Sequence, residues 1–295
     1  QSNKQNPLLF PRLVKFFPVK EAETLFPWLK PDKGLQVMPL FIQRILQCWH
    51  IAMFMQQHSQ SIAKQTNICI DWCNRRKVHL ISDEIYAGSI YRPDQAQFQS
   101  TLKLADTDKG LGPYIHWVYS LSKDFALSGL RVGAAYSENL DIRLPMQKLN
   151  DLCQISSTTQ ILTETLLKSK QAGSSDWVGM FRAENHKRLE RRSFALASLL
   201  DEFNIPYLNP DSGLFIWIDL SRFLDASKST ESELERDLYL SLVHQHGLLL
   251  TPGESMRNER PGFFRCVFTA ATDAEFELAL GRFRTFASTA QPARN

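Results

Sequence analysis

Two short apolar runs, each followed by chemically reactive residues, constrain the fold of this chain most. Val78–Ser82 is largely apolar and leads into Asp83, and Ile115–Ser120 leads into Lys123. Runs of this length favour buried strands, and the segment before the first run, Ile68–Lys77, has a helical pattern. Strands that alternate with helices predict an α/β fold with a mainly parallel sheet and ligands at the strand ends.

The rest of the chain predicts further strands and helices, with a smaller α+β domain after Gly173. Before this point we expect a strand at Arg131–Ser137 and helical segments through Asp151–Gln171. After it we expect a long helix, then strands near Leu214 and Phe263 and helices at Glu231–His246 and Asp273–Phe286.

The stretch SLSKDFALSGLRVG, from Ser120 to Gly133, places one amine between two hydroxyls, with an arginine eight residues after the lysine. The Lys123 amine can form an imine with an aldehyde. Ser120, Ser122 and Arg131 can donate hydrogen bonds to phosphate oxygens. This loop therefore suits an aldehyde that also carries a phosphate.

The strand end that lies forty residues upstream adds two complementary groups. The Asp83 carboxylate can keep a pyridine nitrogen protonated, and the Tyr86 phenol can donate a hydrogen bond to a ring oxygen. Together with the Lys123 loop, these are the polar groups that pyridoxal phosphate requires.

The segments ISDEIY and SLSKDFALSGLRVG resemble those of fold-type I pyridoxal-phosphate enzymes of aminotransferase classes I and II. Their amino-acid sequences are most similar to those of 1-aminocyclopropane-1-carboxylate synthase-like members. The resemblance implies that Lys123 carries the cofactor as an internal aldimine, that Asp83 pairs with the pyridinium and that Tyr86 contacts the ring oxygen. It also implies that Ser120 and Arg131 hold the phosphate and that the protein is a homodimer.

Arg265 stands in an apolar run near the C-terminus, where an unpaired guanidinium would be costly. The resemblance implies that Arg265 binds the α-carboxylate of the substrate through a bidentate pair. Without the resemblance, the favoured interpretation of Arg265 would be a structural ion pair with an acidic residue.

The N-terminal residues do not match the family convincingly. Family members are longer, and they carry a glycine-containing loop and an Asn-Pro-x-Gly element before the Asp, neither of which is found here; Asn6 and Pro7 lie too far upstream. Truncation or misassembly, a divergent enzyme with a rebuilt front half, and an inactive remnant all stay open. We predict a divergent or truncated region at 1–66, part of the large cofactor-binding domain at 67–172, and a small C-terminal domain at 173–295.

Composition excludes little, but it disfavours several classes of function. A net charge of +3 with scattered Lys and Arg does not indicate a nucleic-acid partner, and the densest cluster, 186–192, is expected to be a solvated helix face. Five cysteines without framework spacing suggest reduced thiols, and no metal site is expected. Polar residues interrupt the most apolar stretch, Val37–Met55, and there is no signal-peptide leader, so we expect a cytoplasmic protein that does not span a membrane.

The leading expectation is a pyridoxal-phosphate-dependent aminotransferase that acts on an α-amino acid through Lys123. An elimination of the aminocyclopropane-synthase or carbon–sulfur lyase type is the alternative, because one cofactor linkage serves all these reactions. An inactive scaffold or partner-binding remnant is the non-enzymatic alternative, which fold alone does not exclude.

Overall fold

The computed structural model describes residues 59–92, 98, 100–105, 110–169, 176–225 and 230–289. The predictions for Val37–Met55 and for the Asn-Pro sequence at residue 6 lie outside them. The chain divides into two compact units, the first ending at Ala183 and the second beginning at Glu184. The boundary falls within one long helix, and each unit is described separately below.

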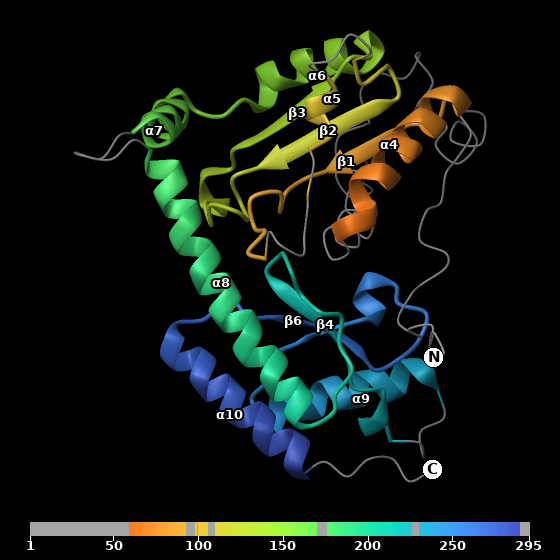
Figure 1. The fold of residues 1–295 in the computed structure, drawn as a ribbon, viewed down its shortest axis with the longest axis vertical. Helices are drawn as coiled ribbons and strands as arrows, with labels where there is room; N and C mark the ends of the chain where they lie inside the picture. The colour runs from red at the N-terminus through yellow and green to blue at the C-terminus, as the bar shows by residue number, and fades with distance from the viewer. Residues whose placement is uncertain are drawn as a thin grey trace. The chain divides into compact units, whose positions relative to one another are not determined.

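The first unit contains a three-stranded sheet in the order β1-β2-β3 (Figure 1). Its strands are β1 (Leu80–Asp83), β2 (Ile115–Ser120) and β3 (Gly133–Ser137). β1 pairs with β2 in parallel, with Asp83 opposite Val118, whereas β3 pairs with β2 antiparallel. The sheet is thus parallel at only one of its two described pairings. Residues 121–132, which connect β2 to β3, contain a 3₁₀ turn and no α-helix, whereas a parallel crossover usually carries a helix.

Several helices accompany this sheet in the first unit, and α4 packs against it. The helix α4 (Ser59–Arg76) packs Ile70 and Cys73 against Leu111 and Ile115, in a cluster whose members are at most 5% exposed. Further elements of the unit are α5 (Leu102–Ala105), the 3₁₀ turn η3 (Ser128–Leu130), α6 (Leu140–Cys153) and α7 (Ser157–Lys168). The predicted helical segment at 151–171 is therefore the end of one helix followed by a second helix, which begins after the N-cap Ser156.

The second unit is built on an antiparallel sheet in the order β4-β6-β5. Its strands are β4 (Phe215–Asp219), β5 (Thr251–Pro252) and β6 (Phe263–Val267). The helices are α9 (Glu231–His244), α10 (Asp273–Thr289) and the C-terminal part of α8 (Trp177–Glu202), with 3₁₀ turns η4 (Ser221–Phe223) and η5 (Glu254–Met256). Fully or almost fully buried side chains form its core, among them Leu200, Ile216, Ile218, Leu242, Phe264, Phe283 and Phe286.

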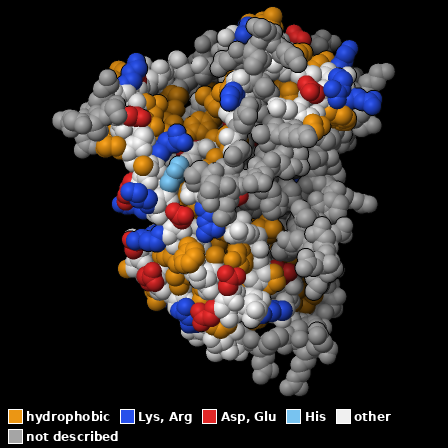
Figure 2. All heavy atoms as spheres, in the orientation of Figure 1, with side chains coloured by type: hydrophobic (Ala, Val, Ile, Leu, Met, Phe, Trp, Pro, Cys, Tyr) orange, Lys and Arg blue, Asp and Glu red, His pale blue; other side chains and the backbone are white. Residues whose placement is uncertain are grey.

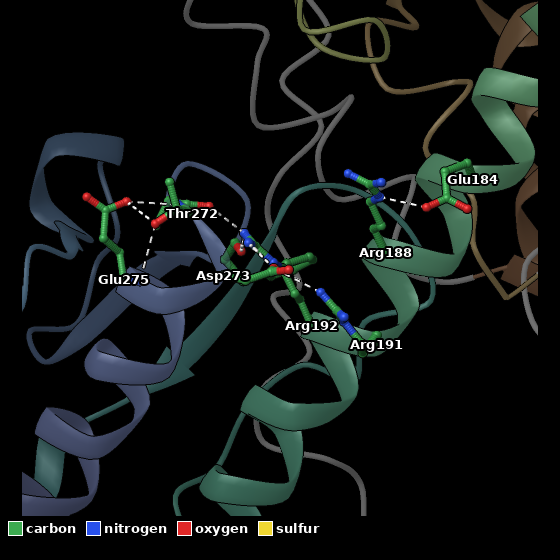
Figure 3. A network of polar contacts seen from close by, with 9 residues as sticks. Glu184, Arg188, Arg191, Arg192, Thr272, Asp273 and Glu275 are labelled. Atoms are coloured by element: carbon green, nitrogen blue, oxygen red, sulfur yellow. Dashed lines mark hydrogen bonds and ion pairs between the residues drawn. The ribbon is translucent and has the colours of Figure 1, made fainter.

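The basic cluster of α8 makes contacts within the unit. Arg191 and Arg192 both donate to Asp273 at the start of α10, at 2.8 and 2.6 Å, while Arg188 pairs with Glu184 at 2.8 Å (Figure 3). Acidic and basic side chains are interspersed on the face shown in Figure 2. The predicted solvated helix face holds for Arg188 and Arg191, which are exposed, whereas the Arg192 side chain is only 12% exposed and pairs with Asp273. None of the described helices is long and apolar enough to cross a membrane.

Candidate cofactor site

Asp83 lies at the carboxyl end of β1, in the first unit. Its Oδ1 atom accepts a hydrogen bond from the Ile85 backbone N–H at 3.1 Å. Burial raises the pKa of Asp83, the Ile85 hydrogen bond opposes this, and the Glu84 charge adds to the increase. A cation placed beside this carboxylate would lower its pKa, because an opposite charge favours the ionised form. Asp83 is thus suited to a positively charged partner.

The turn that follows Asp83 is held by Glu84, which is 3% exposed. The Glu84 carboxylate accepts from the backbone N–H and the hydroxyl of Thr101, both at 2.8 Å. The next turn brings Tyr86 into the interior, at 3% exposed, and its carbonyl accepts from the Ser89 N–H at 2.9 Å. Asp83 and Tyr86 therefore share one well-fixed turn.

The Lys123 loop begins at the end of β2. The Ser120 Oγ accepts from the Ser122 N–H at 3.2 Å, so its own proton stays available for donation. The Lys123 carbonyl accepts from the Ala126 N–H at 3.1 Å, and Ala126 has a left-handed φ of 54°. A non-glycine residue in this conformation indicates a tightly determined turn.

Arg131 ends the 3₁₀ turn of the same loop, also in the left-handed region with φ 56°. Its side chain is exposed, and Nη1 donates to the Ser128 carbonyl at 2.9 Å. In the part of the chain that the structure describes, Arg131 makes no ion pair. Since a guanidinium has five N–H donors, most of them remain for an anion.

Asp124, directly after Lys123, is a residue that the sequence reasoning missed. It is 5% exposed and accepts hydrogen bonds from Gly88, Ser89 and Tyr119. The available signal was an acidic residue in a loop whose next three residues are apolar, since a carboxylate in such surroundings needs partners.

Arg265 lies on β6, in the second unit. Its Nη2 donates to the Thr251 hydroxyl at 3.2 Å, and the guanidinium stands 5.6 Å from the ring centre of Phe215. The Nε atom is buried and has no hydrogen-bond partner among the residues that the structure describes. Among the described residues Arg265 forms no ion pair, so the structural pair that the sequence alone favoured is not found there.

Five of the predicted residues gather along one edge of the first sheet. Because β1 and β2 are parallel neighbours, the turn with Asp83 and Tyr86 and the loop from Ser120 to Lys123 leave the same edge. A carboxylate, a phenol, two hydroxyls and an amine, with Arg131 later in the loop, fit the chemical groups of pyridoxal phosphate in kind. Arg265 belongs to the other unit.

Known proteins that resemble this chain include enzymes of the aminotransferase class I and II family. The family model for aminotransferase class I and II matches residues 63–283. The chain is 37% identical over 224 residues to 1-aminocyclopropane-1-carboxylate synthase 11 of Arabidopsis thaliana, covering 76% of this chain and 46% of that protein. It is 35% identical over 224 residues to the synthase CMA101 of Cucurbita maxima, with 75% and 46% covered.

Solved structures share the fold. The aromatic aminotransferase of Pyrococcus horikoshii matches with a TM-score of 0.62 at 20% identity, over 76% of this chain and 55% of that chain. An aspartate aminotransferase of Thermotoga maritima matches with a TM-score of 0.58 at 17% identity, over 75% and 51%.

The fold is therefore that of the fold-type I pyridoxal-phosphate enzymes. The chain belongs to the aminotransferase class I and II family, whose members depend on pyridoxal phosphate. It spans about half the length of the curated relatives it matches.

Proposed function

We propose that this chain carries the cofactor-binding lysine, Lys123, of a pyridoxal-phosphate enzyme that acts on an α-amino acid. The parallel pairing of β1 and β2 carries the proposal, because it brings the turn of Asp83 to the same sheet edge as the Lys123 loop. Membership of the aminotransferase class I and II family supports it.

Each residue has a distinct role in holding the cofactor. When bound, pyridoxal phosphate supplies a ring that accepts electrons from the substrate. Asp83 keeps a proton on the pyridine nitrogen, since an ionised carboxylate stabilises the adjacent cation. Tyr86 donates to the ring oxygen. The phosphate is bound by the hydroxyls and guanidinium of the Lys123 loop, namely Ser120, Ser122 and Arg131.

The substrate meets two further groups of the chain. Arg265 binds the α-carboxylate, and its buried, unpartnered Nε supports a role in binding an anion. The Lys123 Nζ takes the proton from the α-carbon and returns it to another carbon, which makes it the general base and acid of the reaction.

The test is cofactor binding by the purified chain. Pyridoxal phosphate should produce a visible absorbance band, and borohydride reduction followed by peptide mapping should leave the cofactor on Lys123. Lys123→Arg keeps the charge but should lose the band and reduce turnover by about 100- to 10,000-fold. A chain that stays colourless with added cofactor would contradict the proposal and favour an inactive remnant.

Two reactions fit this cofactor, and separate observations favour them. The curated relatives are 1-aminocyclopropane-1-carboxylate synthases, which favours elimination from an amino acid with a leaving group on its γ-carbon. The matching family model, aminotransferase class I and II, favours transamination. Amino acids should be incubated with a keto-acid acceptor. Exchange to a new keto acid without release of the substituent selects transamination, whereas release with formation of the cyclopropane ring selects elimination.

We also propose that the active protein is a cytoplasmic homodimer, because the resemblance to the family implies a homodimer. Light scattering of the purified chain should give twice the mass of one chain. A monomer would count against both the assembly and the activity.

A further inference from the structure

Asp124 joins the two polypeptide segments that carry the proposed cofactor ligands. Its Oδ2 accepts from the Gly88 N–H at 2.7 Å and from the Tyr119 hydroxyl at 3.0 Å, and its Oδ1 accepts from the Ser89 hydroxyl at 2.6 Å. Gly88 and Ser89 follow the Asp83 turn, whereas Tyr119 belongs to β2. One side chain thus ties the loop of Lys123 to both neighbours.

The neighbouring residues leave room for the Asp124 carboxylate and orient its hydrogen-bond partners. A Cβ atom added to Gly88 would lie 2.8 Å from the Asp124 Oδ2, so a side chain at this position would displace the carboxylate. The Tyr119 ring stacks on Trp117, with ring centres 5.9 Å apart, which orients its hydroxyl. Burial raises the pKa of both Asp124 and Tyr119, and the three hydrogen bonds to Asp124 oppose the change in its own pKa.

Phe125, which follows Asp124, is anchored as well. Phe125 stacks on Phe181 of α8 with ring centres 5.6 Å apart, and Phe181 in turn stacks on Trp177 at 5.2 Å. The two residues that follow Lys123 are therefore both held, one by hydrogen bonds and the other by ring stacking. These contacts restrict the backbone directly after Lys123 and so limit the positions that its amine can reach.

We infer that Asp124 is a positioning residue, which holds the Lys123 loop in register with the turn of Asp83 and Tyr86. This inference rests on the proposed function, because it assigns Asp124 to the alignment of the lysine amine with the cofactor ring. Asp124 acts through the backbone and through Gly88, Ser89 and Tyr119, and it is not assigned a contact with the substrate.

Two substitutions at the same position separate geometry from charge. In Asp124→Asn, the amide oxygen can still accept from Gly88 and Tyr119, while the amide nitrogen can donate to the Ser89 hydroxyl, which rotates to accept. Asp124→Ala removes all three bonds. We expect Asp124→Ala to weaken cofactor binding on the order of 10- to 100-fold, as small misplacements do, and Asp124→Asn to restore most of the affinity.

A matched control is available in the second unit. Glu235 is 1% exposed and accepts from the backbone N–H groups of Glu254 and Gly262, both at 2.7 Å. Glu235→Ala also removes a buried carboxylate, yet it should leave cofactor affinity unchanged at temperatures well below unfolding. If Asp124→Ala lowers only the melting temperature and spares the affinity, as Glu235→Ala should, Asp124 is merely structural and the inference fails.

Backbone hydrogen exchange provides a readout that needs no cofactor. Asp124→Ala should accelerate exchange at Leu121, Ala126 and Leu127, whose N–H groups close the loop, whereas Asp124→Asn should not. If Asp124→Ala does not fold, the double variant Ser89→Ala with Tyr119→Phe takes its place. It removes two of the three hydrogen bonds to Asp124, and exchange at the same residues should again accelerate. Unchanged exchange overturns the positioning role, and so does an Asn variant as impaired as the Ala variant. A wild-type chain that shows the protected loop but binds no cofactor instead overturns only the proposed function.

Discussion

The two units differ in how their residues are held together. In the second unit the sheet is packed on large apolar side chains, and Phe264, Ile216 and Ile218 are completely buried. In the first unit, residues 133–136 of β3 are all exposed, and α6 and α7 leave Leu152 81% and Ile161 66% exposed. Apolar burial therefore stabilises the second unit more than the first.

Carboxylates fix turns through hydrogen bonds in both units, as Glu235 does in the second. In the first unit, several of them do so. Asp124 and Glu84 bind turns near the candidate site, and Glu138 accepts from the N–H groups of Leu111 and Gly112 at 2.9 and 2.7 Å. Hydrogen bonds of this kind contribute little net stability, but leaving a buried partner unsatisfied is costly. These polar contacts therefore matter most in the first unit, where β3, α6 and α7 bury little apolar surface.

The largest expected effect comes from matched truncations in the two units. Phe264→Ala should lower the free energy of unfolding by about 3–5 kcal/mol, because it opens a cavity in a closed core. Ile161→Ala should change it by no more than about 0.5 kcal/mol, since this side chain is mostly exposed. Urea unfolding of both variants checks the comparison. A large loss for Ile161→Ala would show that α7 is covered in solution.

A pair of histidines makes the first unit sensitive to acid. The Nδ1 of His79 and the Nε2 of His116 share a hydrogen bond of 2.8 Å, and the Nδ1 of His116 contacts the Ser137 hydroxyl at 2.9 Å. Burial lowers the pKa of His116 to about 4 and also lowers that of His79, and the charge on His79 adds to the effect at His116.

Proton uptake by the unfolded chain makes the protein less stable at low pH. Between the ordinary pKa near 6.5 and about 4, the unfolded chain binds a proton that the folded chain excludes. The stability contributed by His116 is thus fully present above pH 6.5, and up to about 3 kcal/mol is lost as the pH falls to 4. His116→Gln should flatten this part of the stability curve, whereas His244→Gln, at an exposed helix end, should not. An equal slope in both variants would rule out His116 as the source.

Local sequence patterns made much of the fold predictable, and the cofactor residues that they indicate stay a prediction. The strand Ile115–Ser120 was predicted with its observed bounds, and β1, β3, β4, β6 and the C-terminal helices were found within a few residues, because apolar runs and turn residues are local signals. The two-residue strand β5 was not predicted, since it is too short to form an apolar run. The placement of Asp83 and Lys123 at strand ends followed from the same runs.

Other features depend on residues far apart in the sequence. The hydrogen bond of Asp124 to Gly88 spans 36 residues, and that between His79 and His116 spans 37. No local pattern encodes such partners. The sequence patterns also did not indicate the antiparallel direction of β3, which follows a connection without an α-helix. The role of Arg265 stays a prediction, since it belongs to the second unit.

The smallest expected effect comes from helix caps, one in each unit. Ser156 Oγ accepts from the Thr159 N–H at 3.1 Å at the start of α7, and Thr230 Oγ1 accepts from the Glu233 N–H at 3.3 Å at the start of α9. Replacing either residue by Ala should cost the helix about 1 kcal/mol. The two losses should nevertheless be measured in different ways.

Because α7 is largely exposed, Ser156→Ala should accelerate hydrogen exchange along that helix while leaving the urea midpoint nearly unchanged. The helix α9 buries Leu238 and Leu242, so Thr230→Ala should lower the midpoint itself. If Ser156→Ala shifts the midpoint as much as Thr230→Ala does, α7 unfolds together with the core. The contrast between a packed unit and one held by polar contacts would then not extend to its helices.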